Sequence, residues 1–252
     1  MTRPRPSLRR EKSLLRAGGR FVAGCDEVGR GALAGPVSVG MVVVDASAGR
    51  VPTGLADSKL LTASRRDALV PVIRRWCLAS AVGHASPQEV DEWGLTQALR
   101  LAGLRAMVSL DIDPDIVLLD GSFDWLTPPP LESERADPGL WSLDPDEGPA
   151  VPPYPSLAVP PIVTQIKADL TCASVAAASV LAKTTRDAMM IELSTAHPHF
   201  GWHENKGYSS DQHRDELRAH GPCDQHRRSW RLGTVDVSEN AAADCENVAT
   251  SS

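Results

Sequence analysis

Residues Val22 to Val37 read VAGCDEVGRGALAGPV, and this stretch decides how the rest of the chain is interpreted. An apolar run ends in two adjacent carboxylates, Asp26 and Glu27, and a glycine-rich turn that contains one arginine follows at once. A second apolar run continues over Val37–Val44. Apolar runs bounded by turn residues are typical of buried strands. We therefore expect strands over Phe21–Asp26 and Val37–Val44, with the two carboxylates at or just past the end of the first.

The acidic pair and the turn together suggest a ligand. Neighbouring carboxylates such as Asp26 and Glu27 repel each other unless water, a proton or a cation neutralises them, and a divalent metal ion is one natural reason for the pair. Gly29 and Gly31 bring bare backbone close to a ligand, and Arg30 adds positive charge that suits a phosphate or sugar. An ordinary acidic turn after a strand fits the same residues equally well, because Asp, Glu and Gly are common turn formers.

The motif Asp-Glu-x-Gly-Arg-Gly at 26–31, followed by Ala-Gly-Pro at 34–36, resembles the first signature of bacterial ribonuclease HII, the type 2 ribonuclease H family. Residues 176–187 (AAASVLAKTTRD), 206–208 (KGY) and 221–227 (GPCDQHR) resemble further segments of that family. The resemblance covers most of the chain. It implies an α/β, ribonuclease-H-like fold: a mixed five-stranded sheet flanked by helices, with a helical C-terminal extension.

Composition sets broad limits. The 252 residues are 42% hydrophobic, which suits a substantial core, and no apolar stretch is long enough to cross a bilayer. The N-terminal residues lack the apolar segment of a secretion signal. The five cysteines are widely spaced and contain no C-x-x-C pair, which argues against a disulfide framework and against a cysteine-rich zinc site. We expect a cytoplasmic protein with no membrane association.

The formal net charge of −6 is concentrated in two segments. Residues 121–160 carry seven acidic side chains against one arginine, and residues 234–252 carry four acidic side chains and no Lys or Arg. The rest of the chain is therefore mildly basic. The overall charge is weak evidence against a nucleic-acid partner.

The same distribution suggests a division of the chain. Residues 1–20 are basic and polar and predict a partly disordered arm, and residues 234–252 predict a disordered acidic tail. The catalytic domain is expected over residues 21–233. Within it, residues 122–161 contain eleven of the twenty prolines and predict an extended loop or a disordered insertion. Ribonuclease HII chains usually have a much shorter connection here, so this is the largest departure from the family.

The remaining pattern alternates helices and strands. Thr62 or Ser64 can cap a helix, and Ser86-Pro87 can start another. The further elements that we expect are a helix over 62–76, a strand over 77–82, a helix from 86 to about 104, strands over 115–121 and 162–166, and a small-residue helix from about 172 to 193.

Asp120 ends one of these expected strands, a compact run of branched apolar residues. Asp120-Gly121 can also form a hairpin-type turn, so the spacing alone leaves both alternatives open. If two strands that end in acidic residues meet at one sheet edge, they build a site in the way that open α/β sheets often do.

By resemblance to the family, Asp169 completes a catalytic and metal-binding set with Asp26, Glu27 and Asp120. The residue before this acid is usually glycine in the family, whereas this chain has Ala168. No phosphate-binding loop, dinucleotide-binding glycine motif or serine-hydrolase motif is present. Clustered carboxylates without a nucleophilic side chain fit two-metal phosphodiester hydrolysis, and hard oxygen ligands favour Mg²⁺ or Mn²⁺.

The resemblance also implies the substrate, namely the RNA strand of an RNA–DNA hybrid or a single ribonucleotide in duplex DNA. Recognition must then read the 2′-hydroxyl. The family uses the Gly-Arg-Gly turn and the tyrosine for this purpose. The full set expected to bind substrate is Gly29, Arg30, Gly31, Lys59, Lys183, Arg186, Lys206 and Tyr208. A non-catalytic hybrid- or DNA-binding module and a metal-dependent DNA nuclease are the alternatives.

Two histidine-containing stretches attract attention. His197–His203 contains three histidines, but Pro198 and Gly201 predict a turn and no carboxylate set accompanies it. His220, Cys223 and His226 are spaced like zinc ligands but lack a fourth. Three nearby arginines are expected to contact phosphates or to cap a helix: Arg227, Arg228 and Arg231. A sliding-clamp partner is possible for this family, yet no clear clamp-binding peptide follows Gly233, and a monomer is the default.

Overall fold

The structure is a computed structural model that describes residues 5–128 and 152–232. Its centre is a five-stranded sheet in the order β3-β2-β1-β4-β5. β1 pairs antiparallel with β2, β2 pairs antiparallel with β3, and β4 and β5 run parallel to β1. The strands are β1 (Val22–Val28), β2 (Val37–Val44), β3 (Ala79–Ala85), β4 (Ile116–Asp120) and β5 (Ile162–Gln165). The expected mixed five-stranded sheet is confirmed.

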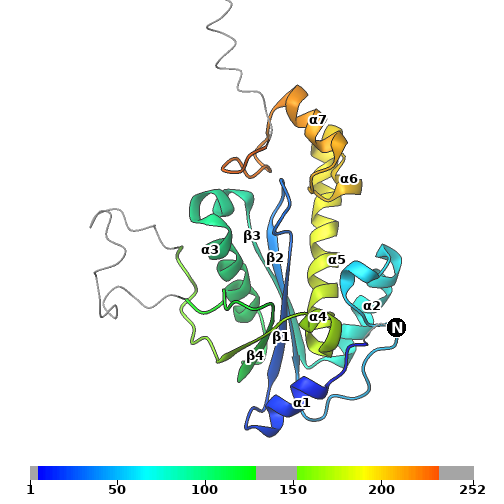
Figure 1. Ribbon diagram of the computed structural model, residues 1–252, viewed down its shortest axis with the longest axis vertical. Coiled ribbons are helices and arrows are strands. Elements are labelled where there is room, and N and C mark those ends of the chain that lie inside the picture. Colours follow the sequence, from blue (N-terminus) through cyan, green and yellow to red (C-terminus); the bar gives the residue numbers. More distant parts are fainter. Residues whose placement is uncertain (1–4, 129–151, 233–252) are drawn as a thin grey trace, which may run out of the picture.

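Helices cover both faces of this sheet (Figure 1). α3 lies on one face, and the long helix α5 lies on the other with α2 packed beside it. The C-terminal extension, α6 and α7, gathers at the far end of α5. The helices are α1 (Arg9–Arg16), α2 (Ala63–Trp76), α3 (Pro87–Val108), α4 (Ala168–Thr171), α5 (Ala173–Ala196), α6 (Trp202–Asn205) and α7 (Asp211–His220), with short 3-10 turns η1 (Ser58–Leu60) and η3 (Pro198–Phe200).

Local sequence signals explain where the helices begin. The Thr62 hydroxyl accepts a hydrogen bond from the Arg65 amide at the start of α2. Ser86 and Glu89 form a reciprocal capping box at the start of α3, with Pro87 in the first turn. Both helix starts were expected from the sequence. No helix of the described residues is apolar for long enough to cross a bilayer.

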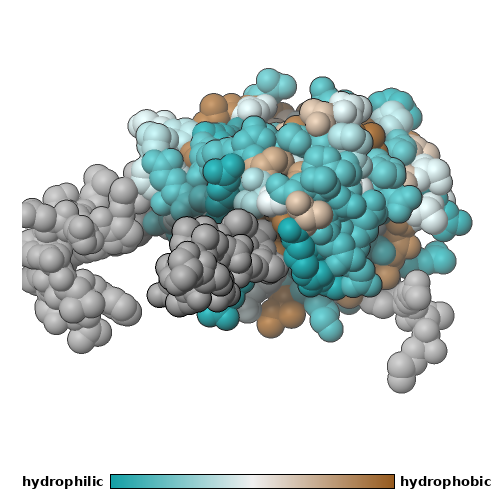
Figure 2. Space-filling model, turned by 90° about the horizontal axis from the view of Figure 1, so that it is seen from above, coloured by the Kyte–Doolittle hydropathy of each residue, from teal (hydrophilic) through white to brown (hydrophobic). Residues whose placement is uncertain are grey.

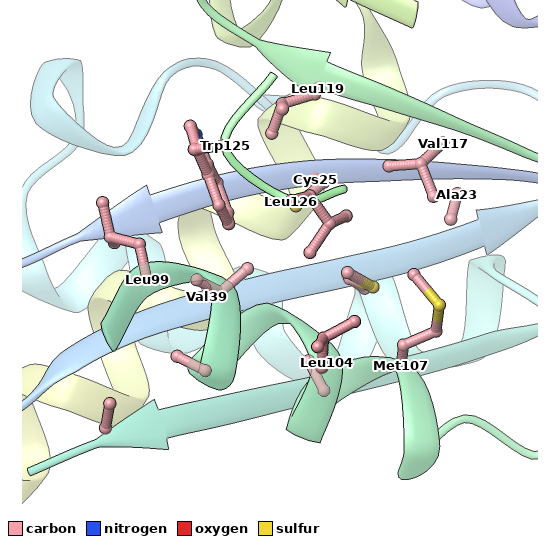
Figure 3. Close-up of a cluster of buried hydrophobic side chains, with 14 of the residues drawn as sticks. Ala23, Cys25, Val39, Leu99, Leu104, Met107, Val117, Leu119, Trp125 and Leu126 are labelled. Atoms are coloured by element: carbon pink, nitrogen blue, oxygen red, sulfur yellow. The ribbon is translucent and has the colours of Figure 1, made fainter. Parts of the chain in front are cut away.

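The main core lies between α3 and the sheet (Figure 3). Leu99, Leu104 and Met107 of α3 face Val39 and other strand residues, and each of the three is at most 4% exposed. Seen from the end that carries α6 and α7, hydrophilic residues dominate the surface (Figure 2). The sequence therefore segregates apolar side chains inside and charged ones outside, as a water-facing α/β domain requires.

Both ends of the proline-rich insertion differ from expectation. Trp125 and Leu126 are buried in the main core, and Tyr154, Leu157 and Val159 pack against it. The described residues 122–128 and 152–161 form no helix or strand, as a loop requires, but the disordered alternative is wrong for them because large apolar side chains among the prolines pack into the core. Residues 129–151 and the expected acidic tail at 234–252 lie outside the described residues.

The expected N-terminal arm contains helix α1 and docks on the body. The Glu11 side chain is fully buried, and its Oε1 accepts hydrogen bonds from the Ser174 backbone N (2.8 Å) and hydroxyl (2.9 Å). The Ser7 backbone forms an isolated parallel β-bridge with the Cys172 backbone. Cys172, the N-cap of α5, makes no side-chain cap, so Glu11 supplies one from a distant segment and places negative charge at the positive end of the α5 dipole.

Two strands have boundaries that differ from the predicted ones. Asp26 and Glu27 lie inside β1 rather than after it, because pairing with β2 continues to Val28 while pairing with β4 stops at Cys25. The third strand covers Ala79–Ala85 rather than 77–82. Asp26 is therefore held on one side by the β2 ladder and is free of the ladder on the β4 side.

Candidate active site

Three elements bring the four predicted acidic residues to one region. Asp26 and Glu27 lie on β1, Asp120 ends the neighbouring parallel strand β4, and Asp169 lies in α4. The Asp120 carboxylate accepts a hydrogen bond from the Ala168 backbone N at 2.7 Å, which ties the start of α4 to the end of β4. Asp120 therefore ends a strand, and the hairpin alternative does not hold. The parallel pairing of β1 with β4 explains the convergence, since like ends of parallel strands share an edge.

Helix α5 lies unusually close to this part of the sheet. A Cβ at Gly24 would overlap the backbone of Ser174, and a Cβ at Gly40, the β2 partner of Asp26, would overlap the Ala178 carbonyl. The close approach brings Ser179 of α5 near Asp26, where its hydroxyl lowers the pKa of that carboxyl. The Ser179 hydroxyl lies 2.8 Å from the Ser58 hydroxyl. Ser179 was not among the predicted site residues, although it lies within the family-like stretch 176–187.

The carboxylates repel one another. Burial raises the pKa of Asp26 to about 8, with further increases from Glu27, Asp120 and Asp169 against the opposing hydrogen bond from Ser179. Burial, Asp120 and Asp57 together raise the pKa of Asp169 to about 6, although Lys59 opposes this. Asp26 is 4% exposed and Asp169 is 7% exposed. The site therefore concentrates negative charge that calls for a cation.

The ammonium group of Lys59 supplies part of the positive charge that the carboxylates require. Burial lowers its pKa, but the attraction of four carboxylates outweighs burial, so that the pKa of Lys59 is raised overall; the four are Asp26, Asp57, Asp169 and Asp120. Asp57 caps the 3-10 turn η1 by accepting a hydrogen bond from the Lys59 backbone N at 2.9 Å. Asp57 was not among the predicted site residues. Its place two residues before Lys59 is the signal that could have indicated it.

The donor set fits a hard divalent ion. All four side chains offer carboxylate oxygens, the ligands that Mg²⁺ and Mn²⁺ prefer. The Oε2 atom of Glu27 is buried and has no hydrogen-bond partner among the described residues. A buried, unpaired carboxylate oxygen is costly, and a bound ion would compensate it. Asp26, Glu27, Asp120 and Asp169 are thus the residues that could hold metal.

Beside this site, two buried arginine side chains hold the turn from Gly29 to Pro36 through hydrogen bonds to backbone carbonyls. We call this pair of arginines the clamp. Arg186 of α5 donates to the carbonyls of Pro36 (2.8 Å), Lys206 (2.9 Å) and Ala34 (3.0 Å). Its side chain is fully buried. The prediction that Arg186 contacts substrate is therefore corrected: its guanidinium is occupied by backbone oxygens, and it positions the turn.

Arg227 forms the second half of this clamp. It donates to the carbonyls of Arg30 (2.9 Å), Gly29 (2.7 Å) and Gly35 (3.1 Å), and it too is fully buried. The sequence suggested that Arg227 contacts phosphate, but its burial under the turn is incompatible with that role. Burial and the nearby Arg186 lower the pKa of Arg227 to about 9. Two buried positive charges with neutral carbonyl partners make the turn attractive to an anion.

The two glycines of the Gly-Arg-Gly turn have different surroundings. Gly29 has φ +89°, and a Cβ there would overlap the Arg186 side chain. Gly31 has no atom within 4 Å of an added Cβ. Arg30 is more than half exposed and donates to Glu27 at 2.9 Å. The protein's own packing requires Gly29, whereas the space at Gly31 is open to a ligand.

Of the remaining predicted substrate residues, Lys183 lies beside Tyr208, whereas Lys59 lies at the carboxylates. The Gly207 carbonyl accepts from the Leu33 backbone N at 2.8 Å, which joins this segment to the turn. The Tyr208 ring centroid lies 5.3 Å from the Arg186 guanidinium carbon and 5.6 Å from Lys183 Nζ. Lys183 also pairs with Asp187 at 2.6 Å, and Lys206 Nζ donates to the His203 carbonyl. Tyr208 is half-buried and Lys59 is exposed.

Comparison with known proteins now bears on this arrangement. A family model described as ribonuclease HII matches residues 23–137 and 149–232. The chain belongs to the ribonuclease HII family. It is 43% identical over 221 residues to a ribonuclease HII of Streptomyces avermitilis, covering 87% of this chain and 81% of that one. It is 41% identical over 225 residues to a ribonuclease HII of Paracoccus denitrificans, covering 89% and 91%. It is accordingly an endoribonuclease of the ribonuclease H type, which hydrolyses the RNA strand of RNA–DNA hybrids.

Solved structures show the same fold. The ribonuclease H2 of Pyrococcus horikoshii OT3 superposes with a TM-score of 0.60 at 26% identity, covering 84% of this chain and 94% of that one. Bst-RNase HIII in complex with Mn²⁺ superposes with a TM-score of 0.59 at 20% identity, covering 91% and 71%. A complex of PCNA and RNase HII from Archaeoglobus fulgidus gives 0.59 at 23% identity, covering 87% and 99%. The last two likenesses concern the fold.

Proposed function

We propose that this ribonuclease HII also incises duplex DNA on the 5′ side of a single embedded ribonucleotide, with two divalent ions in the carboxylate site. The observation that carries the proposal is the juxtaposition of two features. Four mutually repelling carboxylates lie beside an arginine-clamped turn that has free space over Gly31. The first feature suits metal-assisted hydrolysis, and the second suits close approach of a sugar–phosphate.

In this proposal the carboxylates have distinct parts. Asp26, the most buried of them, has a pKa raised by each of the other three and would contact both ions, while Glu27, Asp120 and Asp169 would complete the coordination. When bound, the ions lower the pKa of water and stabilise the leaving oxygen. Ser179 favours the ionised form of Asp26 by lowering its pKa, and Ala168 orients Asp120 through its backbone N. Mn²⁺ or Mg²⁺ fits this oxygen-only donor set.

The turn and Tyr208 would read the ribose. Backbone groups at Gly29–Gly31 can hydrogen-bond a 2′-hydroxyl, which is the group that separates RNA from DNA. The half-buried Tyr208 ring, which lies beside Lys183, can stack on the neighbouring sugar or base. Arg30, Lys59 and Lys206 would add positive charge along the path of the strand. The activity would make the first cut in ribonucleotide excision repair.

Three broader assignments belong to the same proposal. Residues 21–233 would carry the catalytic residues, with the 1–20 segment packed on this domain through Glu11 and residues 234–252 as a tail, and the protein would act as a monomer. A sliding clamp is a possible partner, as the archaeal relative's complex with PCNA illustrates for that protein. A cytoplasmic location is supported by the free state of Cys25, Cys77, Cys172 and Cys223.

The test is a panel of labelled duplexes: one with a single ribonucleotide, an all-DNA control and a continuous RNA–DNA hybrid. Each is incubated with Mg²⁺, Mn²⁺ or a chelator. We expect metal-dependent cutting on the 5′ side of the lone ribonucleotide and within the hybrid, with the all-DNA duplex intact. Cutting of the all-DNA duplex would establish a DNA nuclease instead. Cutting of the hybrid alone would reject the ribonucleotide-incision proposal while keeping the family activity.

A further inference from the structure

A second group of possible metal ligands lies in the C-terminal extension. His197 follows the last residue of α5, and Cys223 and Asp224 lie in the loop after α7. One ligand atom from each of the three side chains lies within 4.8 Å of the other two. His197 Nε2 lies 3.8 Å from Asp224 Oδ1. This group is separate from the four carboxylates on β1, β4 and α4.

The fold explains why neither sequence motif predicted this group. The His197–His203 stretch lacks an accompanying carboxylate, and the His220–Cys223–His226 spacing lacks a fourth ligand. In the structure, His203 is exposed and forms a pair with Glu204, and His220 pairs with Glu216. One residue from each motif, His197 and Cys223, instead comes together with Asp224.

A hydrogen-bond network next to the group fixes the Cys223 loop. The Trp202 indole N–H can only donate, so His213 Nε2 accepts its bond (3.2 Å) and His213 Nδ1 donates to the Tyr208 carbonyl (3.0 Å). His226 Nε2 lies 3.0 Å from His213 Nε2, and His226 Nδ1 accepts a hydrogen bond from the Cys223 backbone N (3.1 Å). The Cys223 sulfur also lies 3.2 Å from His226 Nδ1, so a metal–sulfur bond would replace this weak thiol contact while the backbone hydrogen bond continues to hold the loop.

The His197 side is equally constrained. The His197 backbone N donates to the Leu193 carbonyl at 3.2 Å, and its ring packs against Trp202 with centroids 5.2 Å apart. The Asp224 carbonyl accepts from the Gln88 side chain of α3. The three side chains therefore project from backbone that is already fixed, which lowers the conformational cost of binding an ion.

We propose that His197, Cys223 and Asp224 bind one zinc-like divalent ion. An imidazole nitrogen, a thiolate sulfur and a carboxylate oxygen are the ligand types of protein zinc sites, and three protein ligands leave a fourth position for water. The Cys223 thiol releases its proton to solvent as the metal–sulfur bond forms. Zinc bonds of about 2.0–2.3 Å hold tetrahedral ligand atoms roughly 3.5 Å apart. Side-chain rotations that move the three ligand atoms by about 1 Å would bring them to this spacing.

The position of the site gives the ion a structural role. The Gln225 carbonyl accepts from the Gly35 backbone N at 2.8 Å, and the Arg227 backbone N donates to the Leu33 carbonyl at 2.9 Å. The loop that would hold the ion thus borders the Gly29–Pro36 turn directly. An ion bridging this loop to the end of α5 would stabilise the C-terminal extension against the body and keep the turn in place.

The test uses Co²⁺ as a spectroscopic substitute for Zn²⁺ on the full-length protein, stripped of metal and reduced. Thiolate ligation of Co²⁺ gives a near-ultraviolet charge-transfer band that carboxylate ligation at the active site cannot give. The test variants are Cys223→Ser and His197→Ala. The matched controls are Cys77→Ser, another partly buried cysteine, and His203→Ala, an exposed histidine near His197.

We expect one equivalent of thiolate-bound Co²⁺ in the native protein and in both controls. Zn²⁺ should displace it, and the band should be lost in Cys223→Ser and weakened at least tenfold in apparent affinity in His197→Ala. Circular dichroism of each variant checks folding. The absence of a band in the folded native protein, or a band that persists in Cys223→Ser, would overturn the proposal. Neither result depends on nuclease activity.

Discussion

Two buried polar regions of this molecule are built in opposite ways. In the carboxylate site, Asp26 lies among like charges, and burial together with its neighbours raises its pKa to about 8. Under the Gly29–Pro36 turn, Arg186 and Arg227 are as deeply buried, yet they donate six hydrogen bonds to backbone carbonyls. The first region leaves a buried carboxylate oxygen of Glu27 without a hydrogen-bond partner among the described residues, whereas the second gives most of its donors a carbonyl partner.

The difference teaches which residues act on substrate. Uncompensated buried charge costs stability and is retained where a ligand will supply the counter-charge. Buried groups that are hydrogen-bonded to the protein stabilise the fold and leave little for a ligand. On this reasoning, changes in the carboxylate site should affect activity and spare stability. Substitutions in the clamp should lower stability and have the smaller effect on activity.

The largest effect is expected from Asp26→Asn. The change keeps the shape of the side chain but removes the central negative charge, so cleavage should fall to below about one hundredth of the original rate. Cleavage of the single-ribonucleotide duplex measures this. Asp113→Asn, at an exposed position outside the site, is the control and should cut normally. A rate for Asp26→Asn near that of the native protein would remove Asp26 from the reaction.

Arg186→Met should show the opposite pattern. It leaves three carbonyls without their donor, and we expect a loss of about 3–5 kcal/mol in the free energy of unfolding. Urea unfolding measures this loss. Arg30→Met, on the exposed arginine of the same turn, should change stability by less than about 0.5 kcal/mol while weakening substrate binding. Equal stability of the two variants would show that the clamp is not structural.

The two glycines of the turn offer a matched pair. Gly29→Ala places a Cβ at positive φ against Arg186 and should destabilise the protein by about 1–3 kcal/mol. Gly31→Ala meets no protein atom within 4 Å and should leave stability nearly unchanged, but it should raise KM because the Cβ occupies the space proposed for the sugar. An unchanged KM in Gly31→Ala would place the substrate elsewhere.

A smaller effect concerns pH. Burial, then the neighbouring His213, His197 and Arg228, lower the pKa of His226 to about 4 from 6.5. The unfolded chain therefore binds more protons between these values, so this residue makes the protein lose stability as pH falls from about 6.5 to about 4, by roughly 1–2 kcal/mol. His226→Gln should flatten that part of the stability profile relative to the native protein. An identical slope in both proteins would contradict the assignment.

Much of this arrangement could be predicted from sequence. Thr62, Ser86 and Pro87 give helix starts that are readable locally, and the apolar runs before Asp26 and Asp120 predict two strands that end in acidic residues. The family signatures pointed to the four acidic residues. These features depend on residues close together in the chain, where pattern and structure correspond directly.

Long-range contacts were not readable. Nothing near Glu11 indicates that it caps a helix more than 160 residues away. Arg186 and Arg227 look like surface cations suited to phosphate, and only the fold shows that they are buried under the turn. Trp125 and Tyr154 lie in a segment whose prolines and acidic residues obscured their packing. Each case depends on a partner distant in sequence, which no local pattern encodes.

The central claim is that Asp26 belongs to a site whose buried carboxylates need a bound cation to balance their negative charge. The most direct measurement is thermal unfolding of the native protein and Asp26→Asn, each with chelator and with Mn²⁺, between pH 4 and 8. The raised pKa of Asp26 means that the native protein loses stability as pH rises through this window. Metal-free Asp26→Asn should therefore be increasingly the more stable protein toward pH 8, and Mn²⁺ should raise the unfolding temperature of the native protein but scarcely that of the variant. A variant that is less stable without metal at pH 8, and that is stabilised by Mn²⁺ as much as the native protein, would contradict the account.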